Sequence, residues 1–256
     1  MRPEAIAALS AIHQSGRCIG VVTEQAFSEI EPFLTDVAQL VLDQSDDTTL
    51  YELFNGPMIG EGGSVGRRGK GEKEGEEVII APKEARNERS QILTWLHKNI
   101  QPTNNLEHEE WGILTGVDPL EGTYIQLPSE EDQGKATLSL WEQGPHISQD
   151  SSYVERYEKI AVRIQKAMDE LGITHLKVIE AGNGTVRILP RQINKARTMN
   201  LLASLGAFDR NHMIYFCDGP NDVEFAQTLK LAGGGVVAVG NAVPELKRYA
   251  DYVSDG

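Results

Sequence analysis

Two carboxylates lie four residues apart, directly after an apolar run toward the carboxyl end of the chain. In the string "HMIYFCDGPNDVEF" these are Asp218 and Asp222, with Asn221 between them. Ligands of open α/β sheets bind beyond the carboxyl ends of the strands. Acidic oxygens at such a place suit Mg²⁺, which takes oxygen ligands together with water and substrate phosphate. On spacing alone, Asp218 and Asn221 serve equally well as helix-capping and turn-forming residues.

The elements around these carboxylates alternate between strand and helix. Short apolar runs predict strands at "LKVIE", "TVRILP", "HMIYFC" and "GVVAVG", and helices are predicted at "NKARTMNLLASLG", "PNDVEFAQTLKLA" and "AVPELKRYA". This alternation predicts a parallel sheet with helices on both faces. The amino-terminal part shows the same alternation of helix and strand. A helix is expected over Pro3–Gln14, then a buried strand "RCIGVVT", then a helix from about Glu24, in which Pro32 either makes a kink or begins a second helix.

The middle of the chain has a different pattern. We expect a helix over Lys83–Ile100 and short strands at "TYIQL" and "ATLSLW". A long helix is expected from about Ser151 to Leu171. Its predicted buried face consists of Val154, Ile160, Ile164, Ala167, Met168 and Leu171. The glycine-rich, charged stretch Gly60–Gly75 predicts a mobile loop or hairpin tip.

The fold class predicted from these patterns is α/β. A Rossmann-like parallel core is expected from residues 1–82 and 183–256, and an α+β domain is expected to be inserted between them over residues 83–182.

Composition excludes several classes of function. The chain has 24 Lys and Arg against 38 Asp and Glu, a formal net charge of −14. Such a surface repels phosphate backbones and anionic membranes, so we expect no nucleic-acid or membrane partner. The two cysteines, Cys18 and Cys217, are too few for a disulfide scaffold and are expected as free thiols in buried strands. A cytoplasmic globular protein is therefore expected.

Other motifs give weaker signals. The histidines show no metal-ligand spacing, and no G-x-S-x-G is present to begin a serine hydrolase site. The string "GRRGKG" lacks the Ser or Thr and the preceding strand of a phosphate-binding P-loop.

Three stretches carry a family resemblance. "DGPND" followed by "AGGGVVAVGNAVPELKRYADYV" resembles the fourth motif of the haloacid dehalogenase-like phosphatases, with Cys217 where the family usually has Gly. "VRILPRQINKARTMNLLASLGA" resembles the third motif, and Lys195 is the matching lysine. "RCIGVVTEQAF" resembles the second motif, in which Thr23 matches; members with an inserted cap often have T-G-R where this chain has Thr23-Glu24-Gln25.

The resemblance implies a Mg²⁺-dependent phosphomonoesterase with an inserted cap domain. Lys195, Asp218 and Asp222 would be the catalytic set, and Asp218 and Asp222 would bind the metal directly or through water. Thr23, Lys195 and Asn221 would bind the phosphate of the substrate. The implied substrate is a small phosphorylated metabolite, such as a sugar phosphate or a phosphorylated small acid. A sugar phosphomutase is a close relative.

The nucleophile of the family is missing from the expected place. It is the first Asp of a D-x-D-x-T motif, on a strand that lies between the strands ending here at Thr23 and Cys217. This sequence shows no such motif before the helix at Pro3, and the look-alike "DQSDDTT" at Asp43–Thr49 is expected to be a solvated loop. We therefore expect a fragment or a variant that lacks the catalytic strand. The alternative is a non-catalytic binding or regulatory protein. The sequence leaves the substrate and the oligomeric state open.

Overall fold

The computed structural model describes residues 3–43, 49–67, 75–102, 111–117, 124–126, 136–143, 151–182, 185–204 and 209–254. The chain divides into two compact units. Unit 1 consists of Met1–Glu24, Glu31–Ile80 and Ile193–Gly256, and unit 2 consists of Gln25–Ile30 and Ala81–Gln192. Within the ranges just given, no helix combines the length and the apolar character that crossing a membrane requires.

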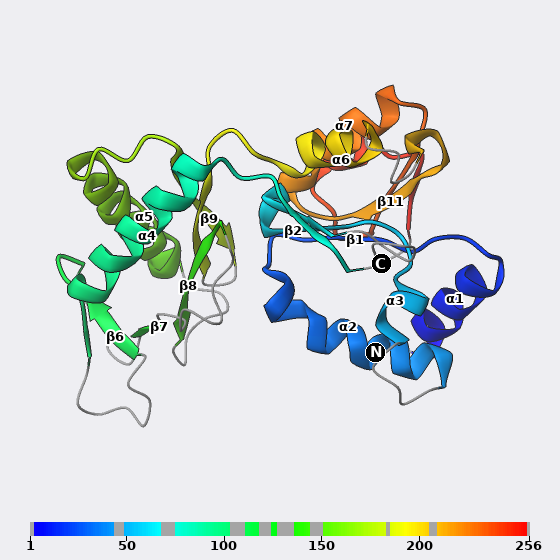
Figure 1. Cartoon of the computed structure of the whole chain (residues 1–256), viewed down its shortest axis with the longest axis horizontal. Coiled ribbons are helices and arrows are strands. Elements are labelled where there is room, and N and C mark those ends of the chain that lie inside the picture. Colours follow the sequence, from blue (N-terminus) through cyan, green and yellow to red (C-terminus); the bar gives the residue numbers. More distant parts are fainter. Residues whose placement is uncertain are drawn as a thin grey trace. The chain divides into compact units, whose positions relative to one another are not determined.

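The amino-terminal part of unit 1 builds a four-stranded sheet. Its order is β1 (Val21–Val22), β2 (Met58–Gly60), β3 (Val65–Arg67) and β4 (Glu77–Ile79), with β1 parallel to β2 and the other pairs antiparallel. Helix α1 (Pro3–Gln14) has the predicted bounds. Helix α2 (Phe27–Leu42) begins after the expected Glu24 and continues through Pro32, and the short α3 (Thr49–Leu53) follows it (Figure 1). Cys18, expected in a buried strand, is exposed in the irregular segment before β1.

The glycine-rich stretch is folded where it is described, so the expected loop was wrong for Gly60–Arg67. A 3₁₀ turn, η1 (Glu61–Gly63), and β3 are buried throughout. Glycine permits this burial, since a Cβ on Gly66 would lie 3.2 Å from a methyl group of Leu202. The predicted hairpin is present as the antiparallel pair β3 and β4, although its tip lies outside the described residues.

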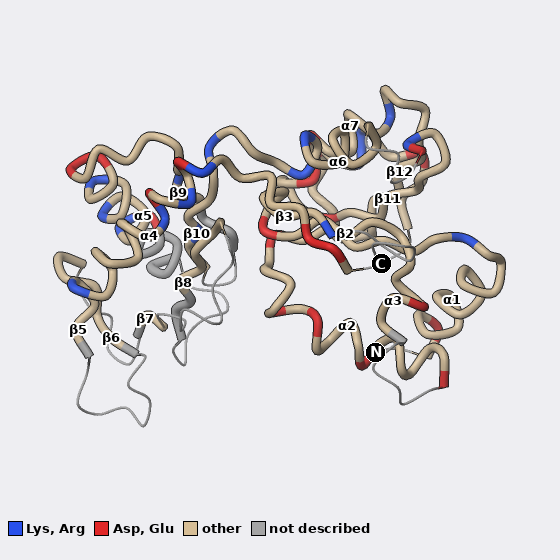
Figure 2. The backbone as a smooth tube through the Cα atoms, viewed as in Figure 1, with Lys and Arg blue, Asp and Glu red and all other residues tan. Residues whose placement is uncertain are grey.

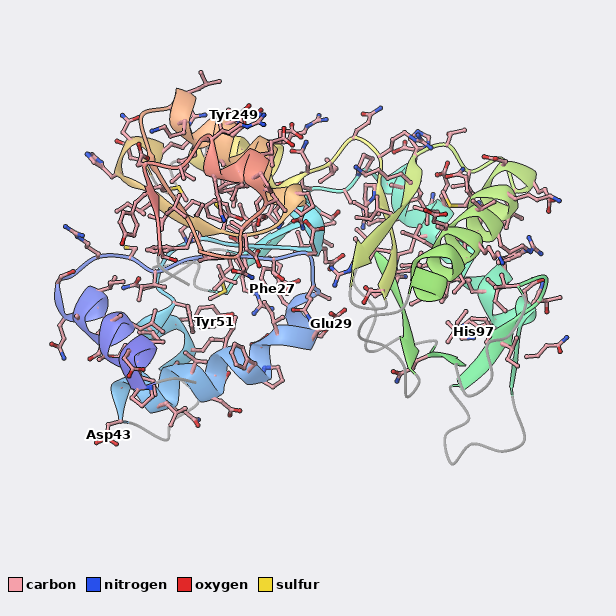
Figure 3. All side chains as sticks on the ribbon, turned by 180° about the vertical axis from the view of Figure 1, so that it is seen from behind. Phe27, Glu29, Asp43, Tyr51, His97 and Tyr249 are labelled. Carbon is pink, nitrogen blue, oxygen red and sulfur yellow. The ribbon has the colours of Figure 1, made fainter. Side chains whose placement is uncertain are left out.

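A buried arginine holds this sheet to its surroundings. Arg67 Nη1 lies 2.9 Å from Glu31 Oε2 and donates to Tyr51 Oη at 3.0 Å, and Arg67 Nη2 lies 2.6 Å from Glu77 Oε1. Tyr51 is labelled in Figure 3. These contacts join β3 to α2, α3 and β4, so the ends of the glycine-rich stretch are fixed by a charged network in addition to backbone pairing.

The carboxyl-terminal part of unit 1 confirms the α/β class. Strands β11 (Ile214–Cys217), β12 (Gly235–Ala238) and β13 (Tyr252–Val253) form a parallel sheet. The helices of this part are α6 (Lys195–Ser204), η2 (Arg210–His212), η3 (Pro220–Asp222), α7 (Val223–Leu231) and α8 (Pro244–Lys247). Alternation along β11 buries Tyr215 and Cys217 among apolar side chains of α6, α7 and α8, whereas Ile214 and Phe216 are exposed.

Unit 2 is an α+β structure with an antiparallel sheet. The strand order is β5 (Ile100–Pro102), β6 (Trp111–Leu114), β7 (Tyr124–Gln126), β8 (Leu138–Gln143), β10 (Thr185–Pro190) and β9 (Leu176–Gly182). Strands β9 and β10 pair antiparallel, so the expectation that they join the parallel sheet was wrong. The predicted domain boundaries at 82/83 and 182/183 remain a prediction.

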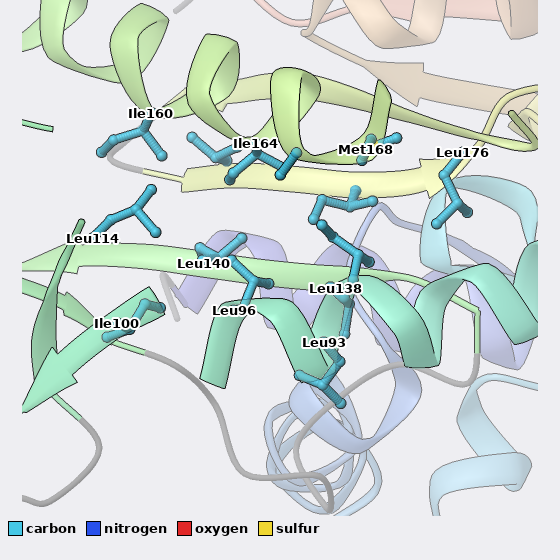
Figure 4. Close-up of a cluster of buried hydrophobic side chains, with 14 of the residues drawn as sticks. Leu93, Leu96, Ile100, Leu114, Leu138, Leu140, Ile160, Ile164, Met168 and Leu176 are labelled. Atoms are coloured by element: carbon cyan, nitrogen blue, oxygen red, sulfur yellow. The ribbon is translucent and has the colours of Figure 1, made fainter. Parts of the chain in front are cut away.

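Helices α4 (Lys83–Asn99) and α5 (Ser151–Glu170) supply much of the core of unit 2. Figure 4 shows Leu93 and Leu96 of α4 and Ile160 and Ile164 of α5 directed toward the strands. Leu171, expected on the buried face of α5, is exposed where the helix ends, and the side chain of Val154 lies outside the described residues.

Glu88 ties α4 to the segment that leads into β9. Its carboxylate accepts the backbone N–H groups of Thr174 at 3.1 Å and His175 at 2.7 Å, and lies 2.8 Å from Nδ1 of His175. Burial would raise the pKa of Glu88, but the hydrogen bonds from His175 and Thr174 outweigh it and lower the pKa below its ordinary value of 4.5.

Acidic side chains recur along α2, which carries Glu29, Glu31 and Asp36 and no Lys or Arg. Figure 2 shows these charges on the backbone trace. An acidic helix of this kind is consistent with the negative net charge of the chain.

Candidate functional site

The two predicted metal ligands follow β11 but differ in environment. Asp218 is exposed directly after the strand, and its backbone carbonyl accepts the N–H of Val243 at 3.0 Å. Asp222 is buried at the end of η3, where α7 begins. One carboxylate of the pair therefore faces solvent, and the other belongs to the interior of unit 1.

Asp222 accepts hydrogen bonds on both of its oxygens. Lys195 Nζ donates to Oδ1 at 2.7 Å, and the hydroxyl of Tyr215 donates to the same oxygen at 2.8 Å. The backbone N–H of Gly219 donates to Oδ2 at 3.3 Å. Burial, together with the charge of Asp222, raises the pKa of Tyr215, so its hydroxyl keeps its proton and remains a donor. The main work of Asp222 in this arrangement is to hold Lys195.

Lys195 is the buried cation of the site. It begins α6, and its side chain is 7% exposed. The close approach of this helix start depends on Gly63, which has a φ of +103° and whose added Cβ would lie 2.4 Å from the carbonyl of Asn194. The hydroxyl of Thr198 also bonds to the carbonyl of Gly63. A glycine in η1 thus permits α6 to place its first residue in the site.

Glu24 is a second carboxylate on the same ammonium. Its Oε1 lies 3.1 Å from Lys195 Nζ and accepts the side-chain amide of Asn221 at 3.1 Å. The Glu24 side chain is 17% exposed. One positive and two negative charges therefore meet at this place, which makes the local charge negative.

Thr23 lies at the end of β1, where the backbone fixes it. Its N–H donates to the carbonyl of Ile59 at 2.8 Å, and its carbonyl accepts the N–H of Gly62 at 3.2 Å. The turn η1, in which Gly62 lies, also contacts the start of α6. Thr23 and Lys195 are therefore held by the same short turn.

The carboxyl ends of two edge strands meet at this site. β1 lies at one edge of its sheet and β11 at one edge of the other, and the two strands are not neighbours in either sheet. The residues that follow them, Glu24 and Asn221, are nevertheless hydrogen-bonded to each other. Among the described residues, no strand pairs with the outer edge of β1 or of β11.

The described side chains fit Mg²⁺ in part. Among them, no group of three or more His, Cys, Asp or Glu is gathered to hold a metal ion. Asp218 is exposed and suits a direct oxygen ligand, whereas Asp222 already accepts three hydrogen bonds and suits contact through water. The assignment of Asp218 and Asp222 as metal ligands remains a prediction.

The structure places Lys195, Asn221 and Asp222 in one network and Asp218 in the loop that carries two of them. Sequence reasoning assigned no role to Glu24 or Tyr215. The signal for Glu24 was its departure from the T-G-R pattern of the family. The signal for Tyr215 was its position two residues before Cys217, on the face of β11 that is buried.

Comparison with known proteins identifies the family of the chain. A model of the haloacid dehalogenase-like hydrolases matches residues 1–256, and the chain belongs to this family. An uncharacterised protein of Geobacillus stearothermophilus is 39% identical over 67 residues, which are 26% of this chain and 66% of that relative. The matched stretch thus spans somewhat less than two thirds of that relative.

Solved structures of low sequence identity share the fold. A protein of Thermoplasma acidophilum superposes with a TM-score of 0.57 at 14% identity, over 100% of this chain and 84% of that one. A haloacid dehalogenase-like hydrolase of Bacteroides thetaiotaomicron gives 0.55 at 16% identity, over 99% and 86%. A second structure from that organism, described among phosphatases of the haloalkanoate enzyme superfamily, gives 0.52 at 16% identity, over 100% and 82%.

Proposed function

We propose that unit 1 provides the phosphate-binding and metal-binding residues of a Mg²⁺-dependent phosphomonoesterase. The substrate would be a small phosphorylated metabolite, such as a sugar phosphate or a phosphorylated small acid. One observation carries the proposal. The carboxyl ends of β1 and β11 meet at the buried ammonium of Lys195, which Asp222 holds at 2.7 Å. Ligands of α/β proteins bind at such strand ends, and a buried ammonium suits a phosphate group.

Each residue has a role in this proposal. Lys195 neutralises the negative charge of the phosphate, and Asp222 positions Lys195. Asn221 orients the phosphate through its side-chain amide. Thr23 would hold a phosphate oxygen with its hydroxyl and the backbone N–H that follows. Tyr215 fixes the carboxylate of Asp222 by donating to the oxygen that also accepts from Lys195.

Mg²⁺ would be held by Asp218 directly and by Asp222 through water. Bound there, it would supply positive charge that stabilises the phosphate oxygens during transfer. The exposure of Asp218 supports this role, because a hard cation needs an accessible carboxylate and room for its waters.

The nucleophile in this proposal is an aspartate on a strand that pairs with the outer edges of β1 and β11. Its carboxylate would attack phosphorus as the bond to the leaving alcohol breaks, and water would then hydrolyse the aspartyl-phosphate. Among the described residues both edges are unpaired, which supports this arrangement, because exposed strand edges present N–H and C=O groups that accept a further strand. The look-alike "DQSDDTT" falls mostly outside the described residues.

Unit 2 would act as the cap that selects the substrate, with residues 83–182 as its predicted extent. Its α+β composition supports this proposal.

A non-catalytic binding protein is the second candidate, and Glu24 favours it. The carboxylate of Glu24 pairs with Lys195, and both oxygens of Asp222 accept hydrogen bonds. These contacts stabilise the fold of the site, and a protein without catalytic activity would retain them for that reason.

The test is a panel of phosphate monoesters, including a reactive aryl phosphate, with millimolar Mg²⁺ and the 256-residue chain. We expect no turnover, together with binding of inorganic phosphate that Lys195→Met abolishes. Turnover that disappears in Asp218→Ala would show that a carboxylate of this chain is the nucleophile. Phosphate binding that survives Lys195→Met would refute the phosphate site.

A further inference from the structure

The carboxylate of Glu24 contacts both of the side-chain donors that the site would offer to an anion. Lys195 Nζ is 3.1 Å from Glu24 Oε1, and Asn221 Nδ2 donates to that oxygen at 3.1 Å. Resting on the proposed function, in which Lys195 and Asn221 hold phosphate, we propose that Glu24 is an internal competitor. Its carboxylate occupies the phosphate position and is displaced when a phosphate group binds.

The competition follows from the donors. An ammonium has three N–H groups, and Asp222 takes one of them at 2.7 Å. The ion pair with Glu24 uses the ammonium again, and the amide of Asn221 turns toward the same carboxylate. One N–H of the ammonium is left over, but Glu24 Oε1 occupies the point at which the donors of Lys195 and Asn221 converge, so a phosphate oxygen that bonds to both residues needs that place.

Charge makes simultaneous occupation unfavourable. Lys195 already balances two carboxylates that are at most 17% exposed. A phosphate dianion placed beside them would be repelled by both, and this repulsion is poorly screened where water is largely excluded. Withdrawal of Glu24 removes one of the two repelling charges and frees the donors in the same movement.

Of the two carboxylates, Glu24 is the one that can leave. Asp222 is held by Tyr215 and by the backbone of Gly219 as well as by Lys195. The partners of Glu24 shown here are two side chains, and the backbone before it is anchored at Thr23. Displacement then requires rotation of one long side chain and leaves β1 and η1 in place.

This arrangement selects among ligands by charge. A ligand has to bond to Lys195 and Asn221 better than a carboxylate does. A phosphate monoester, with two charges and three terminal oxygens, meets this condition. A ligand carrying a single carboxylate offers the same group as Glu24 and gains nothing by exchange. The substrate class expected from the competition is therefore the dianionic phosphate monoesters.

The test is a titration of the 256-residue chain with inorganic phosphate, followed by phosphorus NMR. The variants are Glu24→Gln and Glu24→Ala, each alone and combined with Lys195→Met. Glu4→Gln, at an exposed residue of α1, is the matched control for the loss of one negative charge. Circular dichroism confirms that each variant is folded.

We expect Glu24→Gln and Glu24→Ala to bind phosphate about tenfold more tightly than the unaltered chain, because a competing, partly buried ion pair is removed. Glu4→Gln should bind as the unaltered chain does, and Lys195→Met should abolish binding in every background.

Two results overturn the competition and leave the phosphate site intact. They are an unchanged or a weaker affinity in both Glu24 variants, with binding that still depends on Lys195. Binding that is undetectable in all variants, or indifferent to Lys195→Met, refutes the phosphate site itself and the competition with it.

Discussion

Replacement of Lys195 by Met should destabilise unit 1 strongly. The ammonium is 7% exposed, and it contacts Asp222, which is 8% exposed, and Glu24, which is 17% exposed. Methionine has a similar length and no charge, so the variant removes the cation with little change in volume. Two carboxylates then remain close together without it. Breaking a buried pair by removing one partner costs about 3–5 kcal/mol, against a total stability on the order of 5–15 kcal/mol.

The assay is urea unfolding followed by circular dichroism and by tryptophan fluorescence. Trp95, Trp111 and Trp141 all belong to unit 2, so fluorescence reports that unit, whereas circular dichroism reports both. We expect the loss of stability to appear in the unfolding transition that circular dichroism follows. A second variant, Lys195→Met with Asp222→Asn, should recover most of it, since asparagine can still accept the hydroxyl of Tyr215 without a charge.

A loss below about 1 kcal/mol in Lys195→Met would be typical of an exposed ion pair and would refute the reasoning. A double variant no more stable than Lys195→Met would also refute it, because the cost would then not come from the unpaired carboxylate.

Three further predictions test other parts of the structure. Gly63→Ala should lower the stability of unit 1 by about 2–4 kcal/mol, because the added Cβ would meet the backbone at the start of α6. Gly16→Ala is the control in thermal unfolding, since Gly16 also has a positive φ but has open space around it; this substitution should cost only about 1 kcal/mol. Glu88→Gln should cost about 1–2 kcal/mol at neutral pH. The pKa of Glu88 is lowered in the folded chain, so the stabilisation that this carboxylate provides is present above its ordinary pKa of 4.5 and is lost as the pH falls through the lowered pKa. Urea unfolding at a series of pH values should show the stabilities of the unaltered chain and of Glu88→Gln converging there. A stability difference that stays constant with pH would contradict this origin. Burial, with the charges of nearby carboxylates, raises the pKa of Cys217 to about 12, so at pH 8 only about one such thiol in 10⁴ is ionised. A disulfide reagent should therefore modify the exposed Cys18 rapidly and Cys217 only after unfolding. Rapid reaction of both thiols would place Cys217 at the surface.

Much of the fold follows from local patterns. Helices α1 and α4 begin at the predicted residues, since apolar spacing and a proline near each first turn define them. The strand, turn and helix at "IYFCDGPND" also follow from the sequence, because a β-rich apolar run ends at residues that favour turns. The local pattern places the candidate residues of this loop, whereas their predicted metal-binding and phosphate-binding roles come from the family resemblance.

Most of the remaining features depend on contacts between distant parts of the chain. The antiparallel pairing of β9 and β10 was missed although the local pattern indicates it, because only Asn183 and Gly184 separate the two strands and parallel strands need a much longer connection. Glycines that predict a loop equally permit the close approach of Gly63 to α6. The ion pair between Glu24 and Lys195 joins residues from opposite ends of the chain, so only the tertiary structure reveals that the site contains this carboxylate.

We propose that an aspartate-bearing strand between β1 and β11 completes a phosphatase site. The most direct measurement is hydrolysis of an aryl phosphate by the chain extended at its amino end with an apolar strand that carries D-x-D-x-T. Hydrogen exchange first establishes that the added strand is protected, which shows that it pairs with the sheet. We expect Mg²⁺-dependent hydrolysis in the extended chain and none in the 256-residue chain. This activity should be lost when the first Asp of the added strand becomes Asn, and also in Lys195→Met and Asp218→Ala. A protected strand without hydrolysis, or hydrolysis that persists without that Asp, would contradict the account.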